Sequence, residues 1–225
     1  MECGIGSSIG KLRAPPVSDK TGMTNYGDPN YWDSRYTEAN APFDWYLSYE
    51  HLRPIFAKYA RPDSRILHIG CGNSRVCDAM YDDGYHRVTN IDISDVVIHQ
   101  MRQQHNNAHD GMTFERMDVR KLDFPSESFQ FIFDKGTVDA ILCGTDSYEN
   151  LAQMNKELSR VLAPGGVFVS VSYGLPENRL QHFENTEFNW TVVHEELRRE
   201  EQGDAYHVYV MTKRGPNVPH VEDDE

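Results

Sequence analysis

Short apolar runs alternate with amphipathic stretches along the middle of the chain. Five of these runs have the length of strands, and the segments between them carry helical spacing or turn residues. The predicted strands cover residues 65–69, 88–93, 112–118, 129–133 and 167–171. Strands that alternate with helices predict a mostly parallel sheet with helices on its faces.

Apolar spacing and capping residues predict the helices. Before the first strand, the apolar residues from Leu52 to Tyr59 recur at helical spacing, with Pro54 in the first turn or at a kink. A short helix is expected over residues 74–81, and the next follows Ser94 as its N-cap. Asp146 and Glu149 have the spacing of a capping box for a helix that ends before residues 163–166.

Two further strands, over residues 188–194 and 206–212, are predicted to pair antiparallel because few residues separate them. The predicted fold is α/β: a Rossmann-like, seven-stranded, mostly parallel sheet flanked by helices, with an antiparallel C-terminal hairpin. Residues 1–24 are expected to be a flexible leader, 25–214 the folded domain, and 215–225 a disordered acidic tail.

Composition and charge limit the class of protein. The 225 residues suit one domain, with 39% hydrophobic and 25% charged residues. A formal net charge of −13 disfavours broad nucleic-acid binding and favours a basic partner. No apolar run has the roughly 20 residues of a membrane helix. The four cysteines lack paired metal spacing, so we expect reduced thiols in a cytoplasmic protein.

Candidate chemistry begins at a glycine turn after the first strand. Gly70 and Gly72 permit a tight turn and the close approach of a ligand to the main chain. Asp92 follows about 20 residues later at the end of the second strand, where a carboxylate can accept hydrogen bonds from a ribose. A turn without a ligand remains the alternative for the glycines alone.

Four segments meet at the carboxyl ends of the predicted strands. They are residues 70–73, Asp92, Met117 with Asp118, and Asp134 with Lys135. Ligands on open parallel sheets bind beyond these ends, where the strand order switches. Arg75 stands where a dinucleotide site would have its third glycine. S-adenosylmethionine, with one nucleoside and no phosphate, therefore fits better than a nicotinamide dinucleotide.

An aromatic segment precedes the sheet. Tyr31, Trp32, Arg35 and Tyr36 lie among polar residues, which suits a lid over the site, although core packing is the alternative for most of the aromatic side chains. Aromatic faces would also suit the cationic sulfonium of S-adenosylmethionine.

The chain resembles the seven-strand (class I) methyltransferases. More narrowly, it resembles the eukaryotic elongation factor 1A lysine methyltransferases, together with the related N-terminal domain of the methyltransferase-like proteins. The stretches that carry the resemblance are Tyr-Trp-Asp-Ser-Arg-Tyr at 31–36, Phe-Asp-Trp-Tyr at 43–46, Gly-Cys-Gly-Asn-Ser at 70–74, Met-Asp-Val-Arg at 117–120 and Asp-Lys-Gly-Thr-Val-Asp-Ala at 134–140. The resemblance covers about residues 31–213. It implies methyl transfer from S-adenosylmethionine to a protein lysine, with elongation factor 1A as the partner.

The resemblance also implies roles for single residues. Gly70, Gly72 and Asn73 would form the cofactor floor, and Asp92 would hold the ribose. The other implied cofactor-binding residues are Ile93, Met117 and Asp118 around the adenine, Lys135 beside the methionine part, and Trp32, Tyr36 and Trp45 closing over the site. His68 stands where many class I enzymes have an acid that helps the methionine amino group, so that role is open here.

Catalysis would need an acceptor amine without its proton. Asp134 and Tyr173, both at strand ends, are the candidates for orienting that amine. Two alternatives remain: a methyltransferase for a small molecule, and a non-catalytic protein that holds a basic partner. Zinc through His99, His105 and His109 is disfavoured because their spacing does not place all three on one helix face, so no metal is expected.

Overall fold

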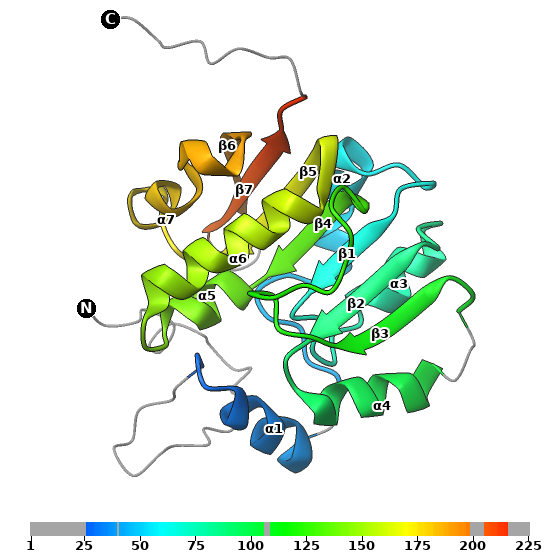
Figure 1. Cartoon of the computed structure of the whole chain (residues 1–225). Coiled ribbons are helices and arrows are strands. Elements are labelled where there is room, and N and C mark those ends of the chain that lie inside the picture. The colour runs from blue at the N-terminus through cyan, green and yellow to red at the C-terminus, as the bar shows by residue number, and fades with distance from the viewer. Residues whose placement is uncertain (1–25, 40, 106–108, 199–204, 216–225) are drawn as a thin grey trace, which may run out of the picture.

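The described residues form one seven-stranded mixed sheet in the computed structural model of the chain (Figure 1). These residues are 26–39, 41–105, 109–198 and 205–215. The strand order is β3-β2-β1-β4-β5-β7-β6. The bounds are β1 Ile66–Ile69, β2 Val88–Asp92, β3 Met112–Arg116, β4 Phe129–Lys135, β5 Leu162–Ser172, β6 Trp190–Arg198 and β7 Ala205–Lys213. Strands β1 to β5 pair in parallel, and β7 pairs antiparallel with β5 and β6, which confirms the predicted architecture.

Helices cover both faces of this sheet and begin near its carboxyl end (Figure 1). They are α1 Pro29–Glu38, α2 Tyr49–Tyr59, α3 Val76–Asp82, α4 Asp95–His105, α5 Thr137–Leu142, α6 Ser147–Val161 and α7 Pro176–Phe183, with a 3₁₀ turn, η1, at Thr186–Phe188. Helix α1 packs against α4, at the lower end of the view in Figure 1. The N-terminal segment thus reaches the side of the sheet where β1, β2 and β4 end.

Alternating strand residues divide the core into two layers. Ile66 packs with α2, α3 and α4 on one face, whereas the next residue, Leu67, packs with α6 and α7 on the other. The ring of Phe56 in α2 lies 5.2 Å from that of Phe131 and 4.9 Å from that of Phe133, measured between centroids. Burying a phenylalanine contributes about 1.5–3 kcal/mol, so these contacts hold α2 firmly on the sheet.

The switch in strand order lies between β1 and β4. From β1 the chain builds outward through β2 to β3, and from β4 it builds the other way through β5. The connections after β1 and β4 therefore leave toward opposite faces. This divergence opens a crevice beyond the carboxyl ends of the two strands, as the sequence predicted.

Some local predictions were wrong. Asp146 makes no side-chain cap bond, because its backbone is left-handed (φ 50°) rather than extended, so the predicted capping box does not form. Pro54 lies inside α2, so of the two predicted placements the first turn is excluded and a kink stays a prediction. Cys71 and Cys77 are free thiols as expected, but Cys143 is disulfide-bonded. The predicted leader and residues 216–225 of the predicted tail lie outside the described residues.

Candidate active site

A cavity lies over the carboxyl ends of the first, second and fourth strands. Its wall combines strand ends, the loops that follow them and the aromatic N-terminal segment. The sequence-predicted residues on this wall are Trp32, Tyr36, Trp45, Gly70, Gly72, Asp92, Ile93, Met117, Asp118 and Lys135. Segments far apart in the chain therefore meet around one space, as the strand-end argument predicted.

The glycine turn needs both of its glycines. Gly70 and Gly72 have φ angles of 56° and 53°, in the left-handed region that side chains disfavour. A Cβ at Gly70 would lie 2.0 Å from Oγ1 of Thr137, and a Cβ at Gly72 would lie 2.7 Å from the hydroxyl of Tyr36. The turn is therefore in close contact with α5 on one side and with α1 on the other.

Asp92 ends β2 with its carboxylate on the cavity wall. Oδ2 accepts a 2.9 Å hydrogen bond from the backbone N–H of Gly72, and Oδ1 accepts one of 2.9 Å from that of Ser94. Burial raises the pKa of Asp92 to about 6, although both hydrogen bonds oppose the rise. A carboxylate offers about four acceptor positions, so two positions stay available for hydroxyl groups.

Asp118 lies at the other end of the cavity, after β3. Burial alone would raise the pKa of Asp118. Its hydrogen bonds with Arg120 and the charge of that guanidinium together have the larger effect and hold the pKa below its usual range. Nη2 of Arg120 lies 2.7 Å from Oδ2 of Asp118, and Nη1 donates to Oδ1 of Asn150 over 2.8 Å. Arg120 and Asn150 also line the cavity, so this end has a rigid polar rim.

Lys135 connects the end of β4 to the N-terminal segment. Its side chain is 4% exposed, and Nζ donates to the carbonyl oxygen of Trp45 at 2.8 Å and to Oδ1 of Asp44 at 3.3 Å. Burial lowers the pKa of Lys135, while Asp44 opposes that change. Asp44 also accepts a hydrogen bond from Ser74 in the glycine turn. One buried cation therefore holds three parts of the wall together.

His68 lines the cavity from β1 as a neutral ring. Burial lowers its pKa to about 4, and the nearby charge of Lys135 acts in the same direction. The amide of Asn90 donates to the carbonyl oxygen of Thr113, so its Oδ1 must accept from Nδ1 of His68 at 3.0 Å. This hydrogen bond leaves Nε2 with the lone pair, which makes His68 a hydrogen-bond acceptor at the position of the usual acid.

The side chains of the aromatic segment line the cavity and also pack in the core. Tyr31 and Tyr36 of α1 are buried, so core packing holds for these two rings. Tyr36 nevertheless reaches the cavity, and the Trp32 ring stacks on it with centroids 6.0 Å apart. The ring of Trp45 meets that of Trp32 edge to face at 6.3 Å. The segment thus covers the cavity with a layer of connected rings.

Three predicted site residues do not lie on the cavity wall. Asn73 donates to the carbonyl oxygen of Ala41 at 2.8 Å and so holds the N-terminal segment. Asp134 is fully buried, and its oxygens accept from the N–H of Thr137 and from Oγ of Ser170. Tyr173 stacks behind Tyr46, with ring centroids 6.5 Å apart. Direct contact of these three with a ligand stays a prediction.

Sequence reasoning missed two residues that shape this wall. Tyr46 lines the cavity, and its hydroxyl donates to Oδ2 of Asp139 at 2.8 Å. Asp139 is 1% exposed and forms a 2.9 Å ion pair with Arg179. Both residues lie within the stretches that carry the family resemblance, which was the only available signal.

The residues of the cavity fit S-adenosylmethionine. The glycine turn lines the cavity, and Asp92 keeps acceptor positions for ribose hydroxyls. Nε2 of His68 can accept from an ammonium group, and Lys135 supplies a positive charge for a carboxylate. Aromatic rings provide faces for a sulfonium.

Comparisons with known proteins agree with this fit. Residues 67–170 match a family model described as a methyltransferase domain. EEF1A lysine methyltransferase 4 of Mus musculus is 33% identical over 198 residues, which cover 84% of this chain and 76% of that protein. Its Bos taurus counterpart is 34% identical, over 89% of this chain and 80% of that protein.

Solved structures share the fold at low identity. A structure from a study of the conversion of a disulfide bond into a thioacetal group during echinomycin biosynthesis has a TM-score of 0.65 and 18% identity, and covers 84% of this chain and 94% of that one. The N-methyltransferase NodS of Bradyrhizobium japonicum, in complex with S-adenosyl-L-homocysteine, has a TM-score of 0.58 and 16% identity over 74% of this chain and 85% of that one.

The fold and the cavity together define an S-adenosylmethionine-dependent methyltransferase. Within this class, the chain belongs to the family of EEF1A lysine methyltransferases. Among the described helices, none is both long and apolar enough to span a membrane.

Proposed function

We propose that this enzyme methylates a lysine side chain of elongation factor 1A. The observation that carries the proposal is the cavity at the carboxyl ends of β1, β2 and β4, where Asp92, His68 and Lys135 surround the glycine turn under an aromatic cover. The relatives named EEF1A lysine methyltransferase 4 support the choice of substrate. A translation factor works in the cytoplasm, and we propose that location for the enzyme on this ground.

The cavity residues have distinct tasks in this proposal. Asp92 accepts hydrogen bonds from the two ribose hydroxyls while the backbone N–H groups of Gly72 and Ser94 hold it in place. Ile93 and Met117 contact the adenine, and the fixed carboxylate of Asp118 supplies the polar rim. S-adenosylmethionine supplies the methyl group on a positively charged sulfur.

The acceptor lysine has to arrive without its proton, because its ordinary pKa is about 10.4 and only the free amine is a nucleophile. The rings of Trp32, Trp45 and Tyr46 exclude water from their side of the cavity, and desolvation lowers the pKa of an amine. The proton of the acceptor lysine is lost to solvent. Alignment of the amine with the methyl group can contribute about 7–11 kcal/mol, so positioning rather than a strong base carries most of the rate.

Charge supports a basic protein partner. The chain carries a formal net charge of −13, and long-range attraction accelerates encounters between oppositely charged surfaces. Raising the ionic strength should therefore raise KM for the protein substrate with little change in kcat.

The test is a transfer assay with labelled S-adenosylmethionine and purified elongation factor 1A, followed by mass spectrometry of the labelled protein. We expect label on a lysine with the wild-type enzyme and loss of at least 90% of the rate with Asp92→Ala. Asp123→Ala, which removes an exposed carboxylate away from the cavity wall, is the matched control and should leave the rate unchanged. Binding of S-adenosylhomocysteine without any transfer to elongation factor 1A would contradict the proposed substrate.

A further inference from the structure

A second cluster of chemically active side chains lies away from the methyltransferase cavity, between α3 and α4. Cys77 and Asp78 are consecutive residues of α3, and His105 is the last residue of α4. The Sγ of Cys77, a carboxylate oxygen of Asp78 and a ring nitrogen of His105 all lie within 4.8 Å of one another. These three residues, called the α3–α4 cluster below, do not line the cavity.

The orientation of the His105 ring suits a metal ligand. Its Nδ1 lies 2.8 Å from the carbonyl oxygen of Met101, which can only accept, so Nδ1 carries a proton and donates. Nε2 faces Oδ1 of Asp78 at 2.5 Å. A histidine whose second nitrogen donates to a backbone carbonyl is the usual arrangement around a protein-bound metal, because that hydrogen bond fixes the ring orientation.

The spacing of the donors also suits a metal. Zinc bonds of about 2.0–2.3 Å place tetrahedral ligands about 3.3–3.7 Å apart. The separations in the cluster, 2.5 Å between Asp78 and His105 and at most 4.8 Å overall, bracket that range. Side chains of Cys77 and His105 are buried, whereas that of Asp78 is 30% exposed and leaves a path to solvent.

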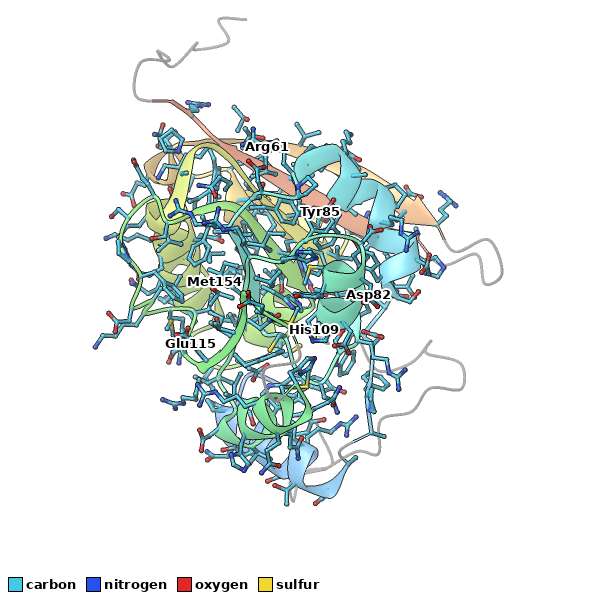
Figure 2. The ribbon with its side chains drawn as sticks, turned by 90° about the vertical axis from the view of Figure 1, so that its right-hand side faces the viewer. Arg61, Asp82, Tyr85, His109, Glu115 and Met154 are labelled. Atoms are coloured by element: carbon cyan, nitrogen blue, oxygen red, sulfur yellow. The ribbon has the colours of Figure 1, made fainter. Side chains whose placement is uncertain are left out.

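His109 gives a second, independent observation. Its ring centroid lies 5.3 Å from that of His105 and 4.3 Å from that of Tyr81, at the end of α3. Figure 2 labels His109 and Asp82 close together on this side of the molecule. Nδ1 of His109 is buried and has no hydrogen-bond partner among the described residues. Such an unpaired buried nitrogen indicates a missing ligand, since buried polar atoms are nearly always paired.

We propose that the α3–α4 cluster is a zinc site with Cys77, Asp78 and His105 as its protein ligands. A water molecule supplies the fourth position of the tetrahedron, since His109 is not among the donors that lie within 4.8 Å of one another. A thiolate, an imidazole and a carboxylate form a donor set that zinc prefers over magnesium or calcium. Coordination displaces the thiol proton of Cys77 and the proton that His105 shares with Asp78 to solvent.

The position of this site gives the metal a structural task. Helix α3 follows the glycine turn that contains Gly72. Helix α4 follows Asp92, and Ser94 caps its N-terminus. A zinc ion joining the two helices would fix the two loops that hold the cofactor, without contact to the cofactor itself. This inference does not depend on the protein substrate proposed above.

The test uses the full chain without a histidine tag, treated with a chelator and then titrated with Zn²⁺ by calorimetry. We expect one equivalent to bind, and Tm to rise by about 5–10 °C when free zinc is 100 times Kd. Co²⁺ in place of Zn²⁺ should give the visible absorption of a tetrahedral site and a thiolate charge-transfer band in the near ultraviolet. Absence of a stoichiometric zinc site in the wild-type chain would overturn the proposal.

Substitutions locate the metal. Cys77→Ser should lose the thiolate band, and His105→Gln should weaken zinc binding at least tenfold. His99→Gln is the matched control, because His99 lies on the exposed face of the same helix and should bind zinc as the wild type does. A cooperative thermal unfolding transition in Cys77→Ser, followed by circular dichroism, would show that the variant is folded. Zinc binding unaffected by both Cys77→Ser and His105→Gln would place the metal elsewhere and overturn the assignment.

Discussion

The hydroxyl of Tyr46 donates a 2.8 Å hydrogen bond to the buried carboxylate of Asp139, across 93 positions of sequence. Asp139 in α5 also accepts from the N–H of Tyr173 at 3.0 Å and pairs with Arg179. Tyr46 lines the cavity, whereas Asp139 does not. The ion pair between Asp139 and Arg179 therefore holds Tyr46 in place on the cavity wall. Asp139 is thus a positioning residue rather than a catalytic one.

Removing only this hydrogen bond should affect turnover more than folding. Tyr46→Phe keeps the ring contacts with Tyr173 and Tyr206 and leaves Asp139 with its other partners. We expect a loss of about 0.5–1.5 kcal/mol in unfolding free energy, an S-adenosylhomocysteine affinity within twofold of wild type, and a kcat at least fivefold lower. Denaturant unfolding, calorimetry and the transfer assay measure these three quantities.

Two further variants serve as comparisons for Tyr46→Phe. Asp139→Ala leaves Arg179, whose side chain is 15% exposed, without its partner and should lower the unfolding free energy by about 3–5 kcal/mol. Tyr148→Phe removes a hydroxyl from a half-exposed ring away from the cavity wall and should change nothing. A Tyr46→Phe enzyme with wild-type kcat would show that the wall position does not depend on this bond.

His68 should bind the amino-acid part of the cofactor. His68→Phe keeps an aromatic ring beside Phe133 but removes the Nε2 acceptor. A hydrogen bond to a charged group contributes about 1.5–3 kcal/mol, so we expect the affinity for S-adenosylhomocysteine to fall about 10-fold to 150-fold. Methylthioadenosine lacks the amino-acid part and should bind wild type and variant equally. Equal losses for both ligands would contradict a contact between His68 and the ammonium group.

The sequence predicted which segments meet at this site, because the ends of the strands could be located from the apolar runs. The second strand was predicted over residues 88–93 and ends at Asp92, and the fourth was predicted over residues 129–133 and forms Phe129–Lys135, almost wholly buried. Parallel neighbours then bring their carboxyl ends together, which placed Gly70, Asp92 and Lys135 around one space.

The side of the wall on which a residue lies was harder to predict. Asp134 and Lys135 are adjacent at the end of β4, and adjacent strand residues point in opposite directions. Only the three-dimensional structure shows that Lys135 faces the cavity while Asp134 holds the N–H of Thr137. Helix α5, with six residues, is too short for a helical period to reveal, so the partnership of Tyr46 with Asp139 had no local signal.

Cofactor affinity should depend on pH through Asp92. The pKa of this carboxyl is raised to about 6 by burial, and its charged form is the stronger acceptor for ribose hydroxyls. As pH falls below 6, binding must first remove a proton, so the affinity should fall by up to about tenfold per pH unit. Calorimetry with S-adenosylhomocysteine between pH 7.5 and pH 5, a range that includes this pKa, measures the slope.

Asp92→Asn provides the control for this titration. The variant should bind more weakly than wild type at pH 7.5, and its affinity should be flat across the same range. Asp134 also has a pKa near 6, raised by burial, and it is retained in the variant. A slope that persists in Asp92→Asn would therefore assign the pH dependence to Asp134 or another group.

The contact between Gly72 and Tyr36 gives the sharpest test of how the aromatic segment meets the glycine turn. Gly72→Ala places a methyl group where Cβ lies 2.7 Å from the hydroxyl of Tyr36, at a φ of 53°. We expect the variant to lose about 1–2 kcal/mol of stability from the left-handed backbone alone, and to bind the cofactor at least tenfold more weakly because α1 is pushed away.

Gly165→Ala is the matched control, since its φ of 73° carries the same backbone strain with open space around the added Cβ. Tyr36→Phe removes the clashing oxygen, so the double variant Gly72→Ala with Tyr36→Phe should regain most of the affinity lost by Gly72→Ala. If the double variant binds no better than Gly72→Ala, the loss comes from the backbone of the turn and not from contact with α1.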